Sequence, residues 1–351
     1  MLTLTGCIYI LTLFNSTSTE VSALRKNRMF KKLLGIRELG PLALLIILSV
    51  GFYFVNPSFL STMNISNMLA YIPELGIIVL GITLLMTAGE VDLSVGSLFG
   101  CTPVLMYILY NENIIPFEAA FLVALVIAAL IGLVNGLLVT KFRIPSIIVT
   151  IGTMLIVRGT GLYISSGFPQ STWQTKSWIK PMLISSVGEI GEFKLLTSLI
   201  WFFGLAVVMH FVLTNTRFGN WIQATGGNVK TARARGVDTD KVKIVLFVIC
   251  SLLAGFAGIM NALRVHAAYP ISGTGYEMEA IAMVVVGGTV LWGGKGTIIG
   301  SVIGVFLLRA IRNGIIVIGI PGLAYNIFVG LVIILMMMIH SLITRAKRGE
   351  G

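Results

Sequence analysis

Few residues of this chain can carry catalytic or metal chemistry. Only 11% of its 351 residues are charged, against about 25% in soluble domains. The three cysteines lie far apart in the sequence, which indicates neither a disulfide framework nor a metal site. The three histidines form no HExxH motif, so a zinc site of that type is excluded. Without Ser-His or paired-acid arrangements, an intramembrane enzyme is the weakest interpretation.

Hydrophobic residues fill the chain instead. They make up 56% of it, the mean hydropathy is +0.96, and apolar runs near membrane length recur throughout. This pattern is typical of polytopic membrane proteins. The runs are continuous rather than alternating, which favours helices over a β-barrel. The 39 glycines suit helices that pack closely in a membrane.

We expect an all-α protein with about ten transmembrane helices and both termini in the cytoplasm. The net charge of +11 does not indicate nucleic-acid binding, because Lys and Arg gather at the ends of apolar runs. Ten spans place 18 of the 25 basic residues on the inner side, and 7, Arg309 among them, at outer positions, as the positive-inside rule requires. The expected spans are 40–56, 66–87, 96–111, 117–139, 145–166, 195–214, 242–263, 277–292, 297–317 and 322–343.

The apolar pattern predicts one membrane domain with short appendages. Residues 1–34 are expected to be an N-terminal extension outside the fold, and residues 346–351 a basic cytoplasmic tail. The domain itself covers residues 35–345. It includes a periplasmic loop at 167–194 and a cytoplasmic loop at 215–242, both longer than a turn.

The segment 77–100 contains two acids between two membrane-length runs. Glu90 and Asp92 precede Ser94, and ionisable groups so near hydrocarbon need a cavity, water or a partner. One interpretation is a polar turn that lines or gates a passage through the membrane. The other is a cytoplasmic turn in which Asp92 caps the next helix through the Ser94 and Val95 amides.

Two other polar positions allow similar alternatives. Asn135 lies within the apolar run GLVNGLL, where it either bonds a neighbouring helix or contacts a polar solute. Glu277 begins an apolar segment, where an acid either stabilises the helix N-terminus or faces a solute or partner. The glycine-rich stretch 286–296 is not a nucleotide-binding loop, because Lys295 is followed by glycine and not by Ser or Thr.

The cytoplasmic loop contains a basic amphipathic stretch. We expect a short helix from about Gly219 to Arg235, ended by Gly236. Such a helix either lies on anionic lipid or docks a soluble partner. Its length and the interruption at 226–228 favour docking.

Four stretches in order resemble one known family. They are GITLLMTAGEVDLSVGS, the block from NGLL at 135–138 through PS to GT at 152–153, the loop ATGGN at 224–228, and the glycine-rich block from GYE at 275–277 to Gly300. Together they are similar to permease subunits of bacterial ATP-binding-cassette sugar importers of the ribose/xylose/autoinducer-2 type. The chain departs from the family pattern at 90–91, where Glu-Val replaces the usual Gly-Ile.

The resemblance implies a transport subunit without chemistry of its own in the bacterial inner membrane. Its expected partners are ABC ATPase subunits, a periplasmic or lipid-anchored sugar-binding protein, a second identical or different permease subunit, and membrane lipid. No cofactor is expected on this chain, since ATP would bind the ATPase. The expected coupling residues are Ala224, Gly226, Gly227, Asn228, Ala232, Arg233 and Gly236, and the expected path or gating residues are Asp92, Ser94, Asn135 and Glu277.

The main alternative is a secondary transporter of a small polar solute, driven by an ion gradient. That class usually has buried carboxylates or broken helices near the middle of the membrane. The sequence interpretation places the acids near the membrane interfaces, which favours the ATP-driven class.

Overall fold

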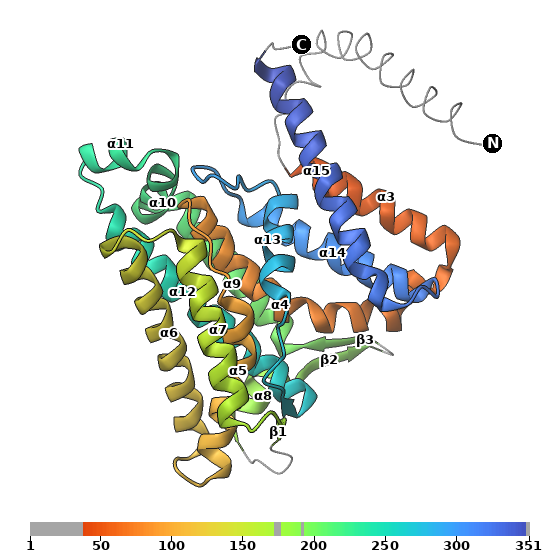
Figure 1. Cartoon of the computed structure of the whole chain (residues 1–351). Helices are drawn as coiled ribbons and strands as arrows, with labels where there is room; N and C mark the ends of the chain where they lie inside the picture. Colours follow the sequence, from red (N-terminus) through yellow and green to blue (C-terminus); the bar gives the residue numbers. More distant parts are fainter. Residues whose placement is uncertain (1–37, 172–176, 191–192, 349–351) are drawn as a thin grey trace, which may run out of the picture.

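The computed structural model describes residues 38–171, 177–190 and 193–348. The expected extension 1–34 and the last residues of the expected tail lie outside these ranges. The described chain is mostly helical (Figure 1). The helices that coincide with the apolar segments are α3 (Leu39–Val55), α4 (Thr62–Thr87), α5 (Val95–Asn111), α6 (Phe117–Lys141), α7 (Ser146–Ile164), α9 (Thr197–Asn215), α12 (Thr239–Val265), α13 (Tyr276–Val286), α14 (Ile298–Val317) and α15 (Tyr325–Arg348).

Each expected apolar segment overlaps one of these helices. Within the described ranges, six are long and apolar enough to cross a membrane: α4, α6, α7, α9, α12 and α14. The expected segment 277–292 is wrong in its second half, because α13 has 11 residues and ends at Val286. Gly288 follows with a φ of +93°, a conformation that glycine adopts without strain and that ends the helix.

The remaining elements are short. The 3₁₀ helices are η1 (Pro57–Leu60) and η2 (Gly322–Ala324), and the short α-helices are α8 (Ile179–Ile184), α10 (Arg217–Gly227) and α11 (Val229–Ala234). Strand β1 (Gln170–Ser171) pairs antiparallel with β4 (Ala267–Ala268), and β2 (Ser186–Ile190) pairs with β3 (Phe193–Leu196). The all-α expectation missed these strands, which lie mainly in and beside the loop 167–194.

Helix α12 lies at the centre of the bundle and packs against α4, α5 and α6. Helix α4 is buried on all sides from Ile72 to Thr87, which is typical of a helix surrounded by protein. Helices α6 and α7 instead keep most of their apolar surface exposed. The core of the molecule therefore lies around α4 and α12, while α6 and α7 form its outer surface.

Glycines allow the central helices to approach closely. A Cβ at Gly132 of α6 would lie 2.5 Å from the Phe247 carbonyl oxygen of α12, and one at Gly136 would lie 2.8 Å from the Ile244 Cα. Small residues at such positions let two helix backbones approach closely. In a membrane this close packing matters because lipid provides no hydrophobic driving force for helix association. The α6–α12 contact therefore depends on glycine at these positions.

The two ends of the bundle differ. Helices α10 and α11 lie together at one end, and α8 and the β2–β3 hairpin lie toward the other (Figure 1). The short helix α13 follows a non-helical segment, 269–275, whose Gly273 and Gly275 have positive φ values of +81° and +87°. A helix of 11 residues spans about 16 Å, so α13 covers only part of a membrane thickness.

Replacing Gly132 with valine is expected to destabilise the bundle. The side chain would collide with the α12 backbone, and overpacking of this kind costs about 1–3 kcal/mol. Gly159→Val in α7 is the matched control, because nothing lies within 4 Å of a Cβ there. The expected result is a lower melting temperature of the detergent-solubilised protein for Gly132→Val alone. Equal melting temperatures for both variants would contradict the packing account.

Candidate functional site

The carboxylate of Asp92 is fully buried between α4 and α5. Its Oδ1 accepts hydrogen bonds from the Ser94 amide at 2.8 Å and from the Ser94 hydroxyl at 2.6 Å. Its Oδ2 accepts a weaker bond from the Ser251 hydroxyl of α12 at 3.5 Å. The expected bond from the Ser94 amide is confirmed. Ser94 is itself the N-cap residue of α5, so Asp92 holds the backbone immediately before the helix and does not cap its first turn.

Asn135 joins the same network from α6. Its Nδ2 donates to the Ser94 hydroxyl at 3.2 Å, and its Oδ1 accepts from the Thr153 hydroxyl of α7 at 2.6 Å. Both ends of a buried amide are thus bonded, as a low-dielectric interior requires. The structure brings together three of the predicted path residues, Asp92, Ser94 and Asn135, and links the start of α5 to α6 and α7.

Glu277 lies elsewhere, in the first turn of α13. It is 7% exposed, its Oε1 accepts from the Gly275 amide at 3.3 Å, and the same oxygen lies 3.7 Å from Nη2 of Arg158 in α7. Its Oε2 packs directly against Gly96 of α5. The expected N-terminal position is confirmed, and the carboxylate faces the protein interior between α5, α7 and α13.

Further buried ionic groups were missed by the sequence interpretation. Glu74, halfway along α4, is 5% exposed and accepts from Nε of Arg264 at 2.8 Å. Arg264 also lies over the Tyr71 ring, at 4.2 Å from its centroid. The signal was present, since a lone acid in the middle of an apolar run marks a functional or paired position. The expectation that the acids gather at interfaces is therefore wrong.

A second missed group surrounds Arg309 in α14. The placement of Arg309 at an outer helix end is wrong, because it lies mid-helix and is 5% exposed. Its Nε and Nη2 have no hydrogen-bond partner within the described part of the chain. Nearby, Glu279 accepts from the Tyr325 hydroxyl at 2.6 Å and lies 3.8 Å from Nη1 of Arg312. Only packing between α13, α14 and α15 brings these groups together.

The expected coupling segment forms two helices rather than one. Helix α10 ends at Gly227, Asn228 is extended, and α11 begins at Val229. The Asn228 side chain accepts from the Thr231 amide at 3.0 Å, so Asn228 caps α11 and breaks the single helix expected over 219–235. The expected stop is confirmed, since α11 ends at Ala234 and Gly236 has a φ of +83°.

The predicted coupling residues differ in exposure. Ala232 is buried at 3% exposure, and Gly226 is half-buried. The others lie on the surface, which suits a docking face: Ala224, Gly227, Asn228, Arg233 and Gly236.

Gly226 lies in a contact that we call the glycine junction, formed by Thr87, Gly89, Gly226, Gly293 and Gly294. The Gly294 amide donates to the Thr87 carbonyl at 2.8 Å. A Cβ at Gly226 would overlap that carbonyl oxygen and lie 2.5 Å from the Gly294 nitrogen. A Cβ at Gly293 would lie 2.8 Å from the Gly89 Cα. The junction therefore joins α10 to the end of α4 and to the loop before α14 by backbone contact.

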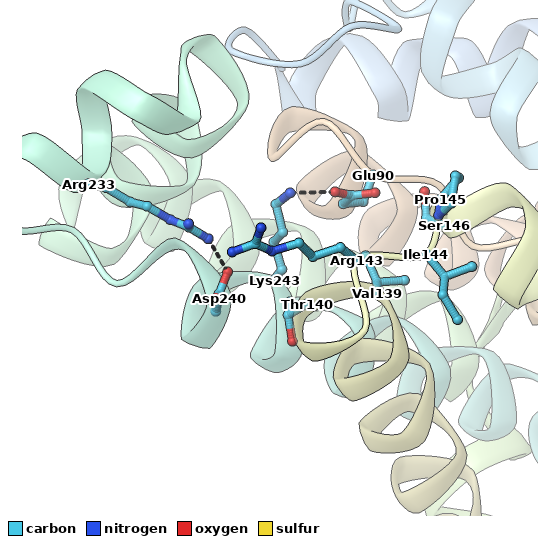
Figure 2. Close-up of a pocket in the computed structure, with 10 residues that line it drawn as sticks. All are labelled: Glu90, Val139, Thr140, Arg143, Ile144, Pro145, Ser146, Arg233, Asp240 and Lys243. Atoms are coloured by element: carbon cyan, nitrogen blue, oxygen red, sulfur yellow. Dashed lines mark hydrogen bonds and ion pairs between the residues drawn. The ribbon is translucent and has the colours of Figure 1, made fainter.

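Two ion pairs hold the start of α12 in the same region (Figure 2). Arg233 of α11 pairs with Asp240 at 2.5 Å and donates from Nε to the Thr239 hydroxyl at 2.8 Å. Lys243 pairs with Glu90 at 2.5 Å. Glu90 is, with Val91, one of the two residues that depart from the resembled family's pattern, and here it connects the segment before α5 to α12.

The fold and the site together define a class of protein. The protein has membrane-length apolar helices, buried polar groups between them and an amphipathic helix pair at one end. This combination is typical of a multi-pass membrane transport protein. Among the described residues, no group of three or more His, Cys, Asp or Glu side chains is placed to hold a metal ion.

Comparison with known proteins gives the family. The family described as "Branched-chain amino acid transport system / permease component" matches residues 64–337, and the chain belongs to it. The ribose import permease protein RbsC of Escherichia coli K12 is 34% identical over 319 residues, covering 90% of this chain and 96% of that protein.

Two further relatives have similar identities. The xylose/arabinose import permease protein XylH of Sulfolobus acidocaldarius is 33% identical, over 86% of this chain and 84% of that protein. The autoinducer 2 import system permease protein LsrC of Yersinia pseudotuberculosis is 35% identical, over 74% of this chain and 71% of that protein. No solved structure matches the chain.

Asp92→Ala is expected to lower the free energy of unfolding by about 1–3 kcal/mol, because the buried Ser94 amide and hydroxyl lose their acceptor. Glu112→Ala, an exposed acid at the other end of α5, is the control and should have little effect. Thermal unfolding in detergent measures both. If the Asp92→Ala variant is as stable as the Glu112→Ala variant, the Asp92 carboxylate does not hold the start of α5.

Proposed function

We propose that this chain is the permease subunit of an ATP-binding-cassette importer, which carries a sugar or sugar-like solute across the bacterial inner membrane. The names of the relatives support this assignment, since ribose, xylose/arabinose and autoinducer 2 permeases all match over most of the chain. The chain has no Walker A motif, so the proposal places ATP on a separate ATPase and no cofactor on this subunit.

The glycine junction is the observation on which the mechanism rests. In the proposal, the ATPase docks on the exposed face of α10 and α11. A force on α10 then reaches α4 and the loop before α14 directly, because their backbones touch at Gly226. A flexible side chain at this position would absorb displacement, whereas backbone contact transmits it.

The proposed topology has ten passages with both termini in the cytoplasm. The six long helices support six of them, and α3 and α5, with 17 residues each, reach the lower limit of membrane-spanning length. Helix α15, with 24 residues, forms the last passage in this scheme. Helix α13 and the segment 269–275 before it together form one passage in this scheme. Broken helices of this kind occur in transporters where a polar site lies within the membrane.

Asp92, Ser94, Asn135 and Glu277 belong to the gate in this proposal. The network at Asp92 fixes the start of α5 against α6 and α7. Glu277 lies at the start of the short α13 and contacts both α5 and α7. Movement of α13 would therefore change the surroundings of the Glu277 carboxylate, which contacts Gly96 of α5.

The proposed partners are two ATPases, a second identical or different permease subunit, surrounding lipid and an external sugar-binding protein. Reconstitution of the chain in proteoliposomes tests the assignment. Solute uptake should require the ATPases, ATP and the binding protein. Uptake by the chain alone, driven by an ion gradient, would contradict it. Mass spectrometry of the co-purified binding protein and its bound solute would identify the sugar.

Gly226→Ala is expected to uncouple ATP hydrolysis from transport. The added methyl group would separate α10 from Thr87 and Gly294, and we expect uptake to fall about tenfold, which corresponds to about 1.4 kcal/mol. Gly204→Ala in α9 is the matched control, because it lies outside the coupling segment and nothing lies within 4 Å of a Cβ there. ATPase activity and uptake are measured together in proteoliposomes. Equal uptake by the two variants would contradict transmission through the junction.

A further inference from the structure

A cavity of about 330 Å³ opens where α6 ends and α7 begins, at the end of the bundle that carries α11 (Figure 2). Three cations line it: Arg143 of the α6–α7 turn, Arg233 of α11 and Lys243 of α12. Two acids also line it, Glu90 and Asp240. The function proposed above leaves this cavity without a role.

The charges in the cavity do not cancel. Asp240 is paired with Arg233 and Glu90 with Lys243, each at 2.5 Å. Arg143 forms no hydrogen bond or ion pair with any residue that the structure describes, and its guanidinium extends into the space between the two pairs (Figure 2). One positive charge is therefore left for an external anion.

The backbone conformation at Arg143 indicates that its side chain has a role in the cavity. Its φ is +57°, in the left-handed region that glycine or asparagine occupies at lower cost. Strained positions of this kind gather at ligand sites. The turn geometry would favour glycine, so the turn alone gives no reason for an arginine.

The surroundings of the cavity are apolar on the outer side. Phe142 is 71% exposed, and Ile147 and Ile148 are 52% and 63% exposed. Only 33% and 22% of the most apolar 18-residue stretches of α6 and α7 are buried within the protein. Helix α7 begins at Ser146 on the cavity wall, so the positive end of its dipole lies at the cavity.

We propose that this cavity binds the phosphate group of an anionic phospholipid such as phosphatidylglycerol. Arg143 supplies the charge, and the exposed apolar side chains of α6 and α7 contact the acyl chains. Basic pockets between transmembrane helices bind anionic headgroups on the cytoplasmic side. That this end faces the cytoplasm rests on the function proposed above. The adjoining apolar surface favours lipid over an acidic side chain of the ATPase.

Native mass spectrometry of the detergent-solubilised full chain tests this site. Wild type should retain phosphatidylglycerol in preference to phosphatidylcholine. Arg143→Gly should bind phosphatidylglycerol about tenfold more weakly, as loss of a charge-assisted hydrogen bond predicts, with phosphatidylcholine unchanged. Glycine adopts the positive φ without strain, so folding is retained. Lys230→Gln, which removes an exposed cation of α11 outside the cavity, is the control and should bind as wild type does.

Three results would overturn the proposal. Equal retention of phosphatidylglycerol by Arg143→Gly and wild type would remove Arg143 from the site. Displacement of the lipid by an equal concentration of inorganic phosphate would indicate a free-phosphate site. In a third outcome, Arg143→Gly would retain the lipid as wild type does but would no longer co-purify with the ATPase. That result would assign the cavity to an acidic group of the partner. The lipid measurement contains no ATPase, so its outcome is independent of the coupling mechanism.

Discussion

Backbone contact at Gly226 is the constraint on which the arrangement of the whole α10–α11 end depends. The Thr87 carbonyl accepts from the Gly294 amide at 2.8 Å, and Gly226 fits against both groups because it has no side chain. Three segments separated by more than 60 residues therefore meet at one point. The exposed face of α10 and α11 therefore rests on α4 of the core directly, and on α14 through its preceding loop.

Polar side chains buried inside the apolar bundle also determine how its helices are arranged. A buried polar group is costly unless it is bonded, and most of those described here connect different helices. Thr83 of α4 bonds Ser301 of α14 at 2.8 Å, and Asn135 bonds Ser94 and Thr153. These bonds fix which helices are neighbours, whereas lipid-like apolar surface does not. A small number of polar side chains therefore contributes to the specific order of the helices, together with the glycine contacts between α6 and α12.

The sequence predicted the helices well and the connections between them less well. Apolar run length identified every long helix, because a membrane dictates that length. It overestimated α13, whose end depends on the backbone at Gly288, and it missed the break at Asn228. The resemblance identified the α10–α11 segment, and residue chemistry identified Asp92 and Asn135. Arg309 was assigned by its position along a span and Glu74 was not assigned at all, because the groups that surround both residues come from other helices and are set only by tertiary packing.

The most direct test of transmission through the glycine junction is a pair of distances measured between spin labels in the assembled transporter. Labels at Lys230 of α11 and Lys295, next to Gly294, report on the junction itself. Labels at Lys230 and Glu112, at the far end of α5, report on the bundle. The account predicts that ATP binding leaves the first distance unchanged and alters the second. A change in the Lys230–Lys295 distance on ATP binding would contradict it.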